Sequence, residues 1–228
     1  MLHIKTEIVL DGIQDSKRLV FILGWGNTLQ DRWLDWFRDN ISDQKWSLMV
    51  IEIPTEYSNF KEILEEINLT LQNFKCEILL AHSMGSLFAR YISSENLKQR
   101  IFLSPFWKIP KRTLILGSEP ISRALLFLLK WCRKPLLYRN FERSDIGIID
   151  LPNSEPTHIS PSTMHTVMRA QQKIPPYSAN DLVIYCPDDR VIDPSVCHGI
   201  TYQGGHLVFC VKERERILTQ LKEIINNS

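Results

Sequence analysis

The sequence predicts an α/β fold in which helices cover both faces of a mainly parallel sheet, with a helical insertion. Three observations support this prediction. Short apolar runs alternate with stretches of helical period along much of the chain. Between Pro105 and about Ala179 this alternation stops, and only helical stretches interrupted by proline remain. The chain has 228 residues, of which 44% are hydrophobic, so it suits one domain with a large core and an insertion.

The predicted strands are short runs bounded by turns or by helical patterns. Residues 78–81, for example, form a run of four apolar residues directly before a turn, which is typical of a strand. The predicted strands are IKTEIVL (4–10), LVFIL (19–23), SLMVIEI (47–53), EILLA (77–81), RIFL (100–103), DLVIYC (181–186) and GITY (199–202).

Helical patterns fall between several of these strands. After Ser83, the apolar residues Leu87, Phe88, Tyr91 and Ile92 recur at the spacing of one helix face. Strands that alternate with helices in this way are connected by crossovers, which favours parallel pairing. The predicted helices of the core span residues 29–41, 59–74, 84–94 and 212–226.

The insertion carries two further helical patterns. One begins near Ser118, which we predict to be the N-cap, with Pro120 in the first turn. The other spans residues 160–174 and begins in a similar way. We find no convincing strand between Pro105 and Ala179. The predicted domains are therefore a core of residues 1–104 and 180–228, and a helical cap of residues 105–179.

Composition and charge exclude several classes of protein. The net charge of +1 argues against generic binding to nucleic acid, which requires a basic surplus. The N-terminus lacks the features of a signal peptide, and the apolar run at residues 124–132 is shorter than the roughly 20 residues of a membrane span. An odd number of cysteines without a CxxC pair favours reduced thiols. We expect a cytoplasmic protein without a membrane span.

A metal site is not expected either. Cys186, Cys197, His198 and Cys210 have suitable side chains, but their spacing matches no zinc-finger pattern. The sequence also contains no cofactor motif that we can identify. We therefore expect neither a metal nor an organic cofactor.

Ser83 lies in the stretch EILLAHSMGSLFARYI, where a predicted strand changes abruptly into a predicted helix. A tight strand-turn-helix elbow presents its serine hydroxyl at the end of the strand and requires small residues two positions before and after it. Ala81 and Gly85 satisfy that requirement. This pattern indicates a nucleophilic serine. The alternative is an ordinary turn in which Ser83 caps the helix.

The loop FILGWGN, residues 21–27, follows the second predicted strand and has glycines on both sides of Trp25. Such a loop lets backbone N–H groups approach a ligand closely, and we expect Gly24 to contact substrate. Beside an elbow, the N–H groups of Trp25 and Met84 are placed to bind an oxyanion. The GxGxxG pattern is incomplete, so this is not a dinucleotide-binding loop.

The C-terminal quarter supplies an acid and a base. Asp189 follows a predicted strand in CPDDRVIDP, and His206 follows a glycine pair in YQGGHLV. The order serine, aspartate, histidine is the order of elbow-type serine hydrolases. Asp188 and Asp193 remain rivals for the acid and His198 for the base. We expect His82 to pack beside the elbow rather than act as the base.

With these motifs the chain resembles the α/β-hydrolase superfamily over nearly all of its length. The resemblance implies a triad in which Ser83 is the nucleophile, His206 the general base and then acid, and Asp189 the residue that orients His206. Two departures stand out: alanine replaces the usual first glycine of the elbow, and only 17 positions separate Asp189 from His206. A connecting helix is therefore expected to be short or missing.

An intact serine triad favours hydrolysis of an acyl ester through an acyl-enzyme. The fold also hosts other chemistries, and some members bind ligands without catalysis. The alternatives are therefore a general carboxylesterase or thioesterase, and a non-catalytic binding protein. Apolar residues of the insertion, including Trp107, suggest a site for a medium acyl chain.

Basic charge is concentrated in the insertion. Between Pro105 and Asp145 there are nine Lys or Arg residues against three acidic residues. A solvated helix face would account for this surplus, but so would a docking surface for an acidic acyl carrier protein. The GWG loop and HSMG elbow are also similar to the pimeloyl-carrier-protein methyl esterases of biotin synthesis. We expect the substrate carrier to contact Arg123, Arg133, Arg139 and Arg143.

Overall fold

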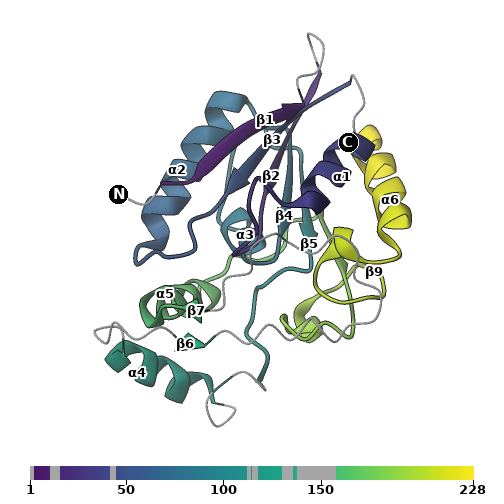
Figure 1. The fold of residues 1–228 in the computed structure, drawn as a ribbon. Coiled ribbons are helices and arrows are strands. Elements are labelled where there is room, and N and C mark those ends of the chain that lie inside the picture. The colour runs from purple at the N-terminus through teal and green to yellow at the C-terminus, as the bar shows by residue number, and fades with distance from the viewer. Residues whose placement is uncertain are drawn as a thin grey trace.

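In the computed structural model, a mostly parallel sheet forms the centre of the molecule (Figure 1). The structure describes residues 3–10, 16–41, 45–111, 114, 118–129, 136–137 and 158–228. Within these residues the main sheet has seven strands in the order β1-β3-β2-β4-β5-β8-β9. The strands are β1 (Lys5–Leu10), β2 (Lys17–Ile22), β3 (Trp46–Glu52), β4 (Ile78–His82), β5 (Gln99–Leu103), β8 (Asp181–Tyr185) and β9 (Ile200–Thr201).

The pairing confirms the predicted topology. Only β1 runs antiparallel to its neighbour β3, and every other pair in the main sheet of the described chain is parallel. Parallel neighbours need a crossover, and the crossovers contain α1 (Arg32–Ile41), α2 (Phe60–Phe74) and α3 (Met84–Ala89). The fourth core helix, α6 (Arg214–Asn227), follows the last strand.

The central strands are apolar on both faces because helices cover the sheet on both sides. In β2, Leu19 and Phe21 point to one face, and Val20 and Ile22 to the other. The first pair packs with α1 and α6, whereas the second packs with α2 and α3. Figure 1 shows these two helix layers on opposite sides of the strands. The three layers hold the carboxyl ends of the parallel strands along one edge.

Capping residues determine where the helices begin and end. Asn59 accepts the backbone N–H groups of Lys61 and Glu62 at the start of α2, and Lys75 ends that helix in the left-handed conformation. Helix α3 is shorter than the predicted 84–94. It ends at Ala89 because the chain then tightens, with the Tyr91 N–H donating to the Phe88 carbonyl three residues back.

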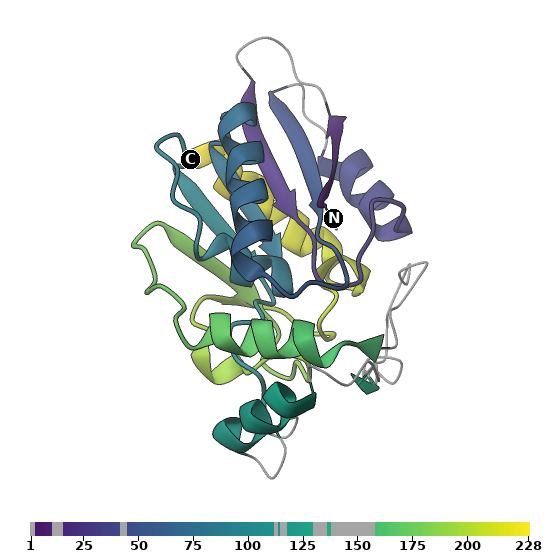
Figure 2. The ribbon, with the colours of Figure 1, turned by 90° about the vertical axis from the view of Figure 1, so that its left-hand side faces the viewer.

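The predicted insertion contains α4 (Glu119–Leu129) and α5 (Pro161–Gln171), which pack against each other. Figure 2 shows α5 between the core and α4. The expectation of no strand in this segment was wrong, since β6 (Leu136–Leu137) pairs antiparallel with β7 (His158–Ile159). Two-residue strands are too short to show a period in sequence. The boundaries of a separate cap domain stay a prediction.

Helix α5 is fixed to the core through its first turn. Ser160 is its N-cap and accepts the Thr163 N–H at 3.1 Å, as expected from the sequence. The Thr163 hydroxyl is fully buried, accepts the Tyr57 N–H at 3.0 Å and lies 3.0 Å from a Glu56 carboxylate oxygen. Glu56 also accepts the Ser160 N–H at 3.0 Å. One carboxylate and one hydroxyl therefore join the segment after β3 to the insertion.

Replacing Thr163 with valine should destabilise the protein by about 1–3 kcal/mol, because the buried Tyr57 N–H loses its acceptor. Urea unfolding measures this change in the free energy of unfolding. Thr166→Val is the matched control: it has the same shape change on the same helix, but its hydroxyl is exposed and donates to the Ser58 carbonyl. The control should cost under about 1 kcal/mol. Equal costs for the two variants would contradict this account of the attachment.

Candidate active site

Ser83 occupies a strained turn between β4 and α3. Its φ of 50° and ψ of −120° are rare for a residue other than glycine. Three backbone hydrogen bonds hold this conformation. The Ser83 N–H donates to the Leu103 carbonyl at 3.0 Å, and the Ser83 carbonyl accepts the N–H groups of Ser86 and Phe106, both at 3.0 Å. The end of β5 and the loop that follows it therefore fix the serine in place.

Small residues flank Ser83 because other backbone segments touch the elbow. A Cβ atom on Gly85 would lie 2.5 Å from the Leu23 carbonyl oxygen and 2.6 Å from that of Ile22. These are backbone atoms at the end of β2, so they have little freedom to move aside. Ala81 is fully buried on β4, opposite Ile22 and Phe102 on its two neighbouring strands. The sequence pattern around Ser83 thus reflects contact with β2 and β5.

A hydrogen-bonded chain runs from Ser83 through His206 to Asp189. The Ser83 hydroxyl lies 2.7 Å from His206 Nε2, and His206 Nδ1 lies 2.8 Å from Asp189 Oδ2. The three residues follow β4, β9 and β8, whose carboxyl ends share one edge of the sheet. The structure therefore brings together the serine, histidine and aspartate that the sequence singled out.

Asp189 is positioned by its own loop. It is 2% exposed, and its Oδ1 accepts the Val191 N–H at 2.7 Å and the Ile192 N–H at 3.3 Å. These two donors leave Oδ2 directed at His206. Between Asp189 and His206 the chain forms only the 3-10 helix η4 (Pro194–Val196) and the short strand β9. The short spacing seen in the sequence is therefore long enough to return His206 to the serine.

The rival residues have other surroundings. Asp188 and His198 are exposed. Asp193 accepts the hydroxyl of Ser195 at 2.6 Å and forms an ion pair with Lys108 at 3.0 Å. Of the three candidate acids, only Asp189 has a carboxylate within hydrogen-bond distance of His206 in the described chain.

Burial keeps the two histidines of the site neutral. It lowers the pKa of His206 well below its usual value, and the nearby His82 lowers it further. Because the carboxylate of Asp189 is an acceptor, Nδ1 of His206 carries the proton and Nε2 is free to accept the Ser83 hydroxyl. A low pKa means that this neutral form is the one present at pH 7. The ring is thus in the state that a general base requires.

His82 supports the backbone of the His206 loop. Burial lowers its pKa to about 4, so it too is neutral at pH 7. Its Nε2 donates to the His206 carbonyl at 3.0 Å, while Nδ1 lies 3.2 Å from Asn27 Oδ1. The ring is packed beside that of His206, with 4.9 Å between the ring centroids. His82 therefore contacts the base through its main chain, as expected for a neighbour rather than the base itself.

Sequence reasoning missed Asn27 and Asp31. The Asn27 amide donates to Asp31 at 3.4 Å, and the same fully buried carboxylate accepts the Thr28 N–H and the Trp33 indole N–H, each at 3.1 Å. These bonds fold the segment after β2 against His82. The signal in the sequence was weak, because an aspartate just before a helix is usually a solvated cap.

The GWG loop lies directly on the elbow. A Cβ atom on Gly24 would be 2.7 Å from His82 Nδ1 and 3.0 Å from Ser83 Cβ, so the backbone approaches as closely as glycine permits. The Trp25 indole N–H donates to the Thr55 carbonyl at 2.7 Å, which fixes this side chain against the segment after β3. Met84 packs under Tyr57, whose hydroxyl lies 3.1 Å from the Met84 sulfur.

The structure locates some of the predicted substrate-binding residues but not all of them. Trp107 is buried, and its indole N–H donates to the Ser86 carbonyl on α3 at 3.2 Å. Arg123 lies on α4 and is half-buried. Arg133, Arg139 and Arg143 lie outside the described residues, so the predicted arginine cluster is not located.

Within the described chain, no group of three or more His, Cys, Asp or Glu side chains is arranged to hold a metal ion. The thiols of Cys76, Cys186, Cys197 and Cys210 are buried and form no disulfide with one another. None of the helices in the same part of the chain combines the length and hydrophobicity needed to cross a bilayer.

Comparison with known proteins places the fold. No protein-family model matches the chain, and no curated protein matches its sequence. Among solved structures, the monoacylglycerol lipase of Paleococcus ferrophilus superposes with a TM-score of 0.67 at 14% identity, covering 100% of both chains. A soluble variant of the Saccharomyces cerevisiae monoglyceride lipase superposes with a TM-score of 0.68 at 15% identity, covering 98% of this chain and 91% of the other.

MenH of S. aureus is similar in the same way, with a TM-score of 0.60 at 16% identity, covering 100% of this chain and 99% of MenH. At these identities the likeness concerns the fold. It shows that the chain has the α/β-hydrolase fold that the sequence motifs had predicted.

Proposed function

We propose that this protein is a serine hydrolase that cleaves carboxylic esters through an acyl-enzyme on Ser83. One observation carries the proposal: the buried chain of hydrogen bonds of 2.7 and 2.8 Å from Ser83 through His206 to Asp189. A serine hydroxyl is a weak nucleophile until a neutral base accepts its proton and a third group orients that base. The serine, the base and the orienting group each have a residue at the same edge of the sheet.

The reaction would proceed in two halves. Ser83 Oγ attacks the ester carbonyl carbon as its proton moves to His206 Nε2, which forms a tetrahedral oxyanion. As the oxyanion collapses, the bond to the alcohol breaks and His206 protonates the departing alkoxide. A water molecule then gives a proton to His206 and attacks the acyl carbonyl carbon, which forms a second oxyanion. As it collapses, the bond to Ser83 Oγ breaks, His206 returns the proton to that oxygen, and the acid leaves. Asp189 stabilises the imidazolium that forms twice in the cycle.

The oxyanion would be bound by the backbone N–H groups of Trp25 and Met84. Support comes from the contact between the GWG loop and the elbow, where a Gly24 Cβ would touch both His82 and Ser83. Donors that are already fixed stabilise the developing charge without reorganisation. Asp31 accepts the amide of Asn27 in the segment after β2, and His82, which packs against Asn27, donates to the His206 carbonyl.

The similar structures are consistent with ester hydrolysis. They include monoacylglycerol lipases, carboxylesterases of Nitrososphaera gargenis and an esterase from Exiguobacterium antarcticum. Because the same fold hosts other reactions, the proposal for this chain depends on its site.

A finer proposal concerns the substrate. We propose that the ester is carried on a medium acyl chain bound to an acidic carrier protein, as for the methyl ester of a pimeloyl carrier protein. The support is the basic surplus between Pro105 and Asp145 and the resemblance of the GWG and HSMG motifs. Arginines such as Arg123 would raise the rate of association with the carrier.

Ser83→Ala should lower kcat by about 10³-fold or more, because the nucleophile is removed while the elbow backbone is kept. The wild type should also react covalently with a fluorophosphonate probe at Ser83, as peptide mass spectrometry would show. Ser93→Ala, an exposed serine in the turn after α3, is the control and should keep full activity and labelling. A wild type that fails to label would favour the alternative of a non-catalytic binding protein.

Asp189→Asn should lower kcat by roughly 10⁴-fold, because an amide favours the wrong tautomer of His206. Asp193→Asn is the matched control, since its carboxylate contacts Ser195 and Lys108 rather than the histidine. The control should retain most of its activity in steady-state assays. A crippled Asp193→Asn beside an active Asp189→Asn would show that the acid was assigned to the wrong residue.

Neutralising Arg123, Arg133, Arg139 and Arg143 with glutamine should lower kcat/KM for a carrier-bound ester, most strongly at low salt. Hydrolysis of a small p-nitrophenyl ester should be unaffected, because it needs no carrier contact. Arg38→Gln and Lys61→Gln, on α1 and α2, form a control for loss of basic charge elsewhere. Equal effects on both substrates, or on neither, would favour a general carboxylesterase or thioesterase.

A further inference from the structure

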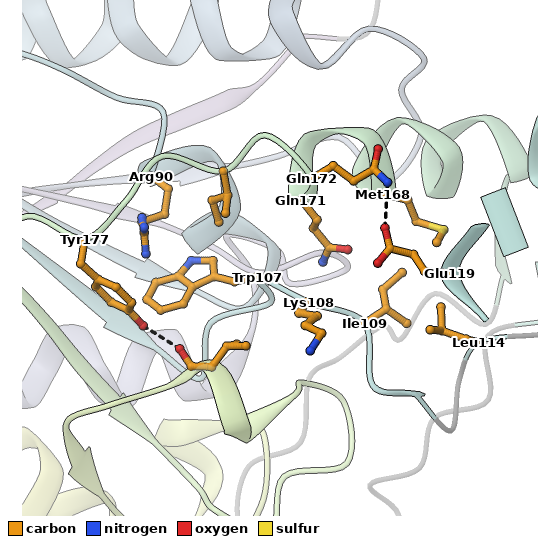
Figure 3. A pocket seen from close by; sticks show the side chains of 12 residues that line it. Arg90, Trp107, Lys108, Ile109, Leu114, Glu119, Met168, Gln171, Gln172 and Tyr177 are labelled. Carbon is orange, nitrogen blue, oxygen red and sulfur yellow. Dashed lines mark hydrogen bonds between the residues drawn. The ribbon is translucent and has the colours of Figure 1, made fainter. Parts of the chain in front are cut away.

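A cavity of about 550 Å³ lies between the end of α5, the start of α4 and the segments that follow β5 and β8. Figure 3 shows the side chains around it. Its wall contains Trp107 and Met168 but none of Ser83, His206 and Asp189. The proposed catalytic chemistry makes no use of this space.

One end of the cavity holds a buried cation. Arg90, at the end of α3, is only 4% exposed. The centre of its guanidinium lies 4.6 Å from the Trp107 ring centroid and 4.3 Å from that of Tyr177, so aromatic rings pack around it. One terminal nitrogen donates to the Pro175 carbonyl. The buried Nε has no hydrogen-bond partner within the described chain.

The charge of Arg90 has no carboxylate of its own. Asp181 is the one carboxylate that acts electrostatically on Arg90 in the described chain, but that side chain is already bound by Arg100, with oxygen-to-nitrogen distances of 2.7 and 3.1 Å. No ion pair to Arg90 occurs among the described residues. The carboxylate of Asp181 is thus engaged by Arg100 and not by Arg90. A buried cation without a counter-ion is costly, and an anion in the cavity would remove that cost.

The other end of the cavity is largely apolar. Figure 3 shows Ile109, Leu114 and Met168 there, away from Arg90 and Tyr177. Glu119 also lies at this end and accepts the Gln172 amide at 2.9 Å. Its carboxylate would repel an anion, whereas Arg90 would attract one. Lys108 also lines the cavity, but its ammonium group forms an ion pair with Asp193 at 3.0 Å. The cavity therefore has a cationic end at Arg90 and an end with apolar side chains, which favours one orientation of a bound anion.

We propose that this cavity binds a free medium-chain fatty carboxylate, separately from the Ser83 centre. The carboxylate would accept from the Arg90 guanidinium beside Trp107 and Tyr177, and the alkyl tail would lie along Ile109, Leu114 and Met168. A volume of about 550 Å³ falls within the range of roughly 300–1,000 Å³ that small-molecule sites occupy. The site requires no catalysis, so it does not depend on the proposed hydrolase function.

Calorimetric titration of Ser83→Ala protein with octanoate and with octanamide tests this inference. The two ligands have the same chain length, but only octanoate carries a charge. We expect octanoate to bind at least tenfold more tightly. Equal affinities would overturn the proposal. Because Ser83 is absent, this outcome is independent of whether the protein is a hydrolase, which the labelling of Ser83 decides separately.

Two variants locate the bound carboxylate. Arg90→Met should weaken octanoate at least tenfold and change octanamide less than threefold. Leu114→Asp places a charge beside the tail and should weaken both ligands. Leu69→Asp is its control, because Leu69 is 59% exposed on α2. Unchanged octanoate affinity in a folded Arg90→Met protein would overturn the site. If that variant does not fold, unchanged affinity in Leu114→Asp would do so.

Discussion

The backbone of Ser83 is held at a φ of 50° by hydrogen bonds to Leu103, Ser86 and Phe106, while the end of β2 packs against Gly85. These contacts are between main-chain atoms and leave no space for side chains. Their geometry follows from the parallel register of β2, β4 and β5, which brings the carboxyl ends of the three strands together. The sheet thereby supplies the strain that lifts the serine hydroxyl out of the turn. Every other part of the site is placed relative to this turn.

Two buried carboxylates organise the segments around the two histidines of the site. Asp189 accepts from the ring of His206, whereas Asp31 binds the segment after β2 that packs against His82, and His82 donates to the His206 carbonyl. Both carboxylates are themselves held by backbone N–H groups, which stabilise their charge away from water. His206 is therefore held both at its imidazole ring and at its backbone carbonyl. This double support fixes the proposed base, which sits on a short loop rather than on a helix.

Much of the fold could be predicted because its signals are local. The apolar runs of β2 to β5, the helical period of α2 and the Ser160 cap are each specified by neighbouring residues. The elbow could be recognised because its steric demand restricts residue types at Ala81 and Gly85. The order of Ser83, Asp189 and His206 came from resemblance, and the structure then brought these residues within hydrogen-bond distance.

Other features depend on tertiary contacts that no local pattern reports. Asn27 and Asp31 resemble ordinary loop and cap residues, and Arg90 resembles a solvated arginine at a helix end. Only packing against His82, or between Trp107 and Tyr177, gives them their surroundings. The pair of β6 and β7 was missed because two residues show no period. Most of the basic segment lies outside the described residues, so a carrier-docking surface stays a prediction.

The acyl-enzyme itself is the most direct test of the central claim, that the hydroxyl of Ser83 is the nucleophile. A reaction with a p-nitrophenyl ester would be quenched in acid within milliseconds and the protein digested for peptide mass spectrometry. The account predicts an acyl group on the peptide that contains Ser83, at the hydroxyl of that residue. Continued ester hydrolysis with an unmodified Ser83 and the acyl group on another side chain would contradict it.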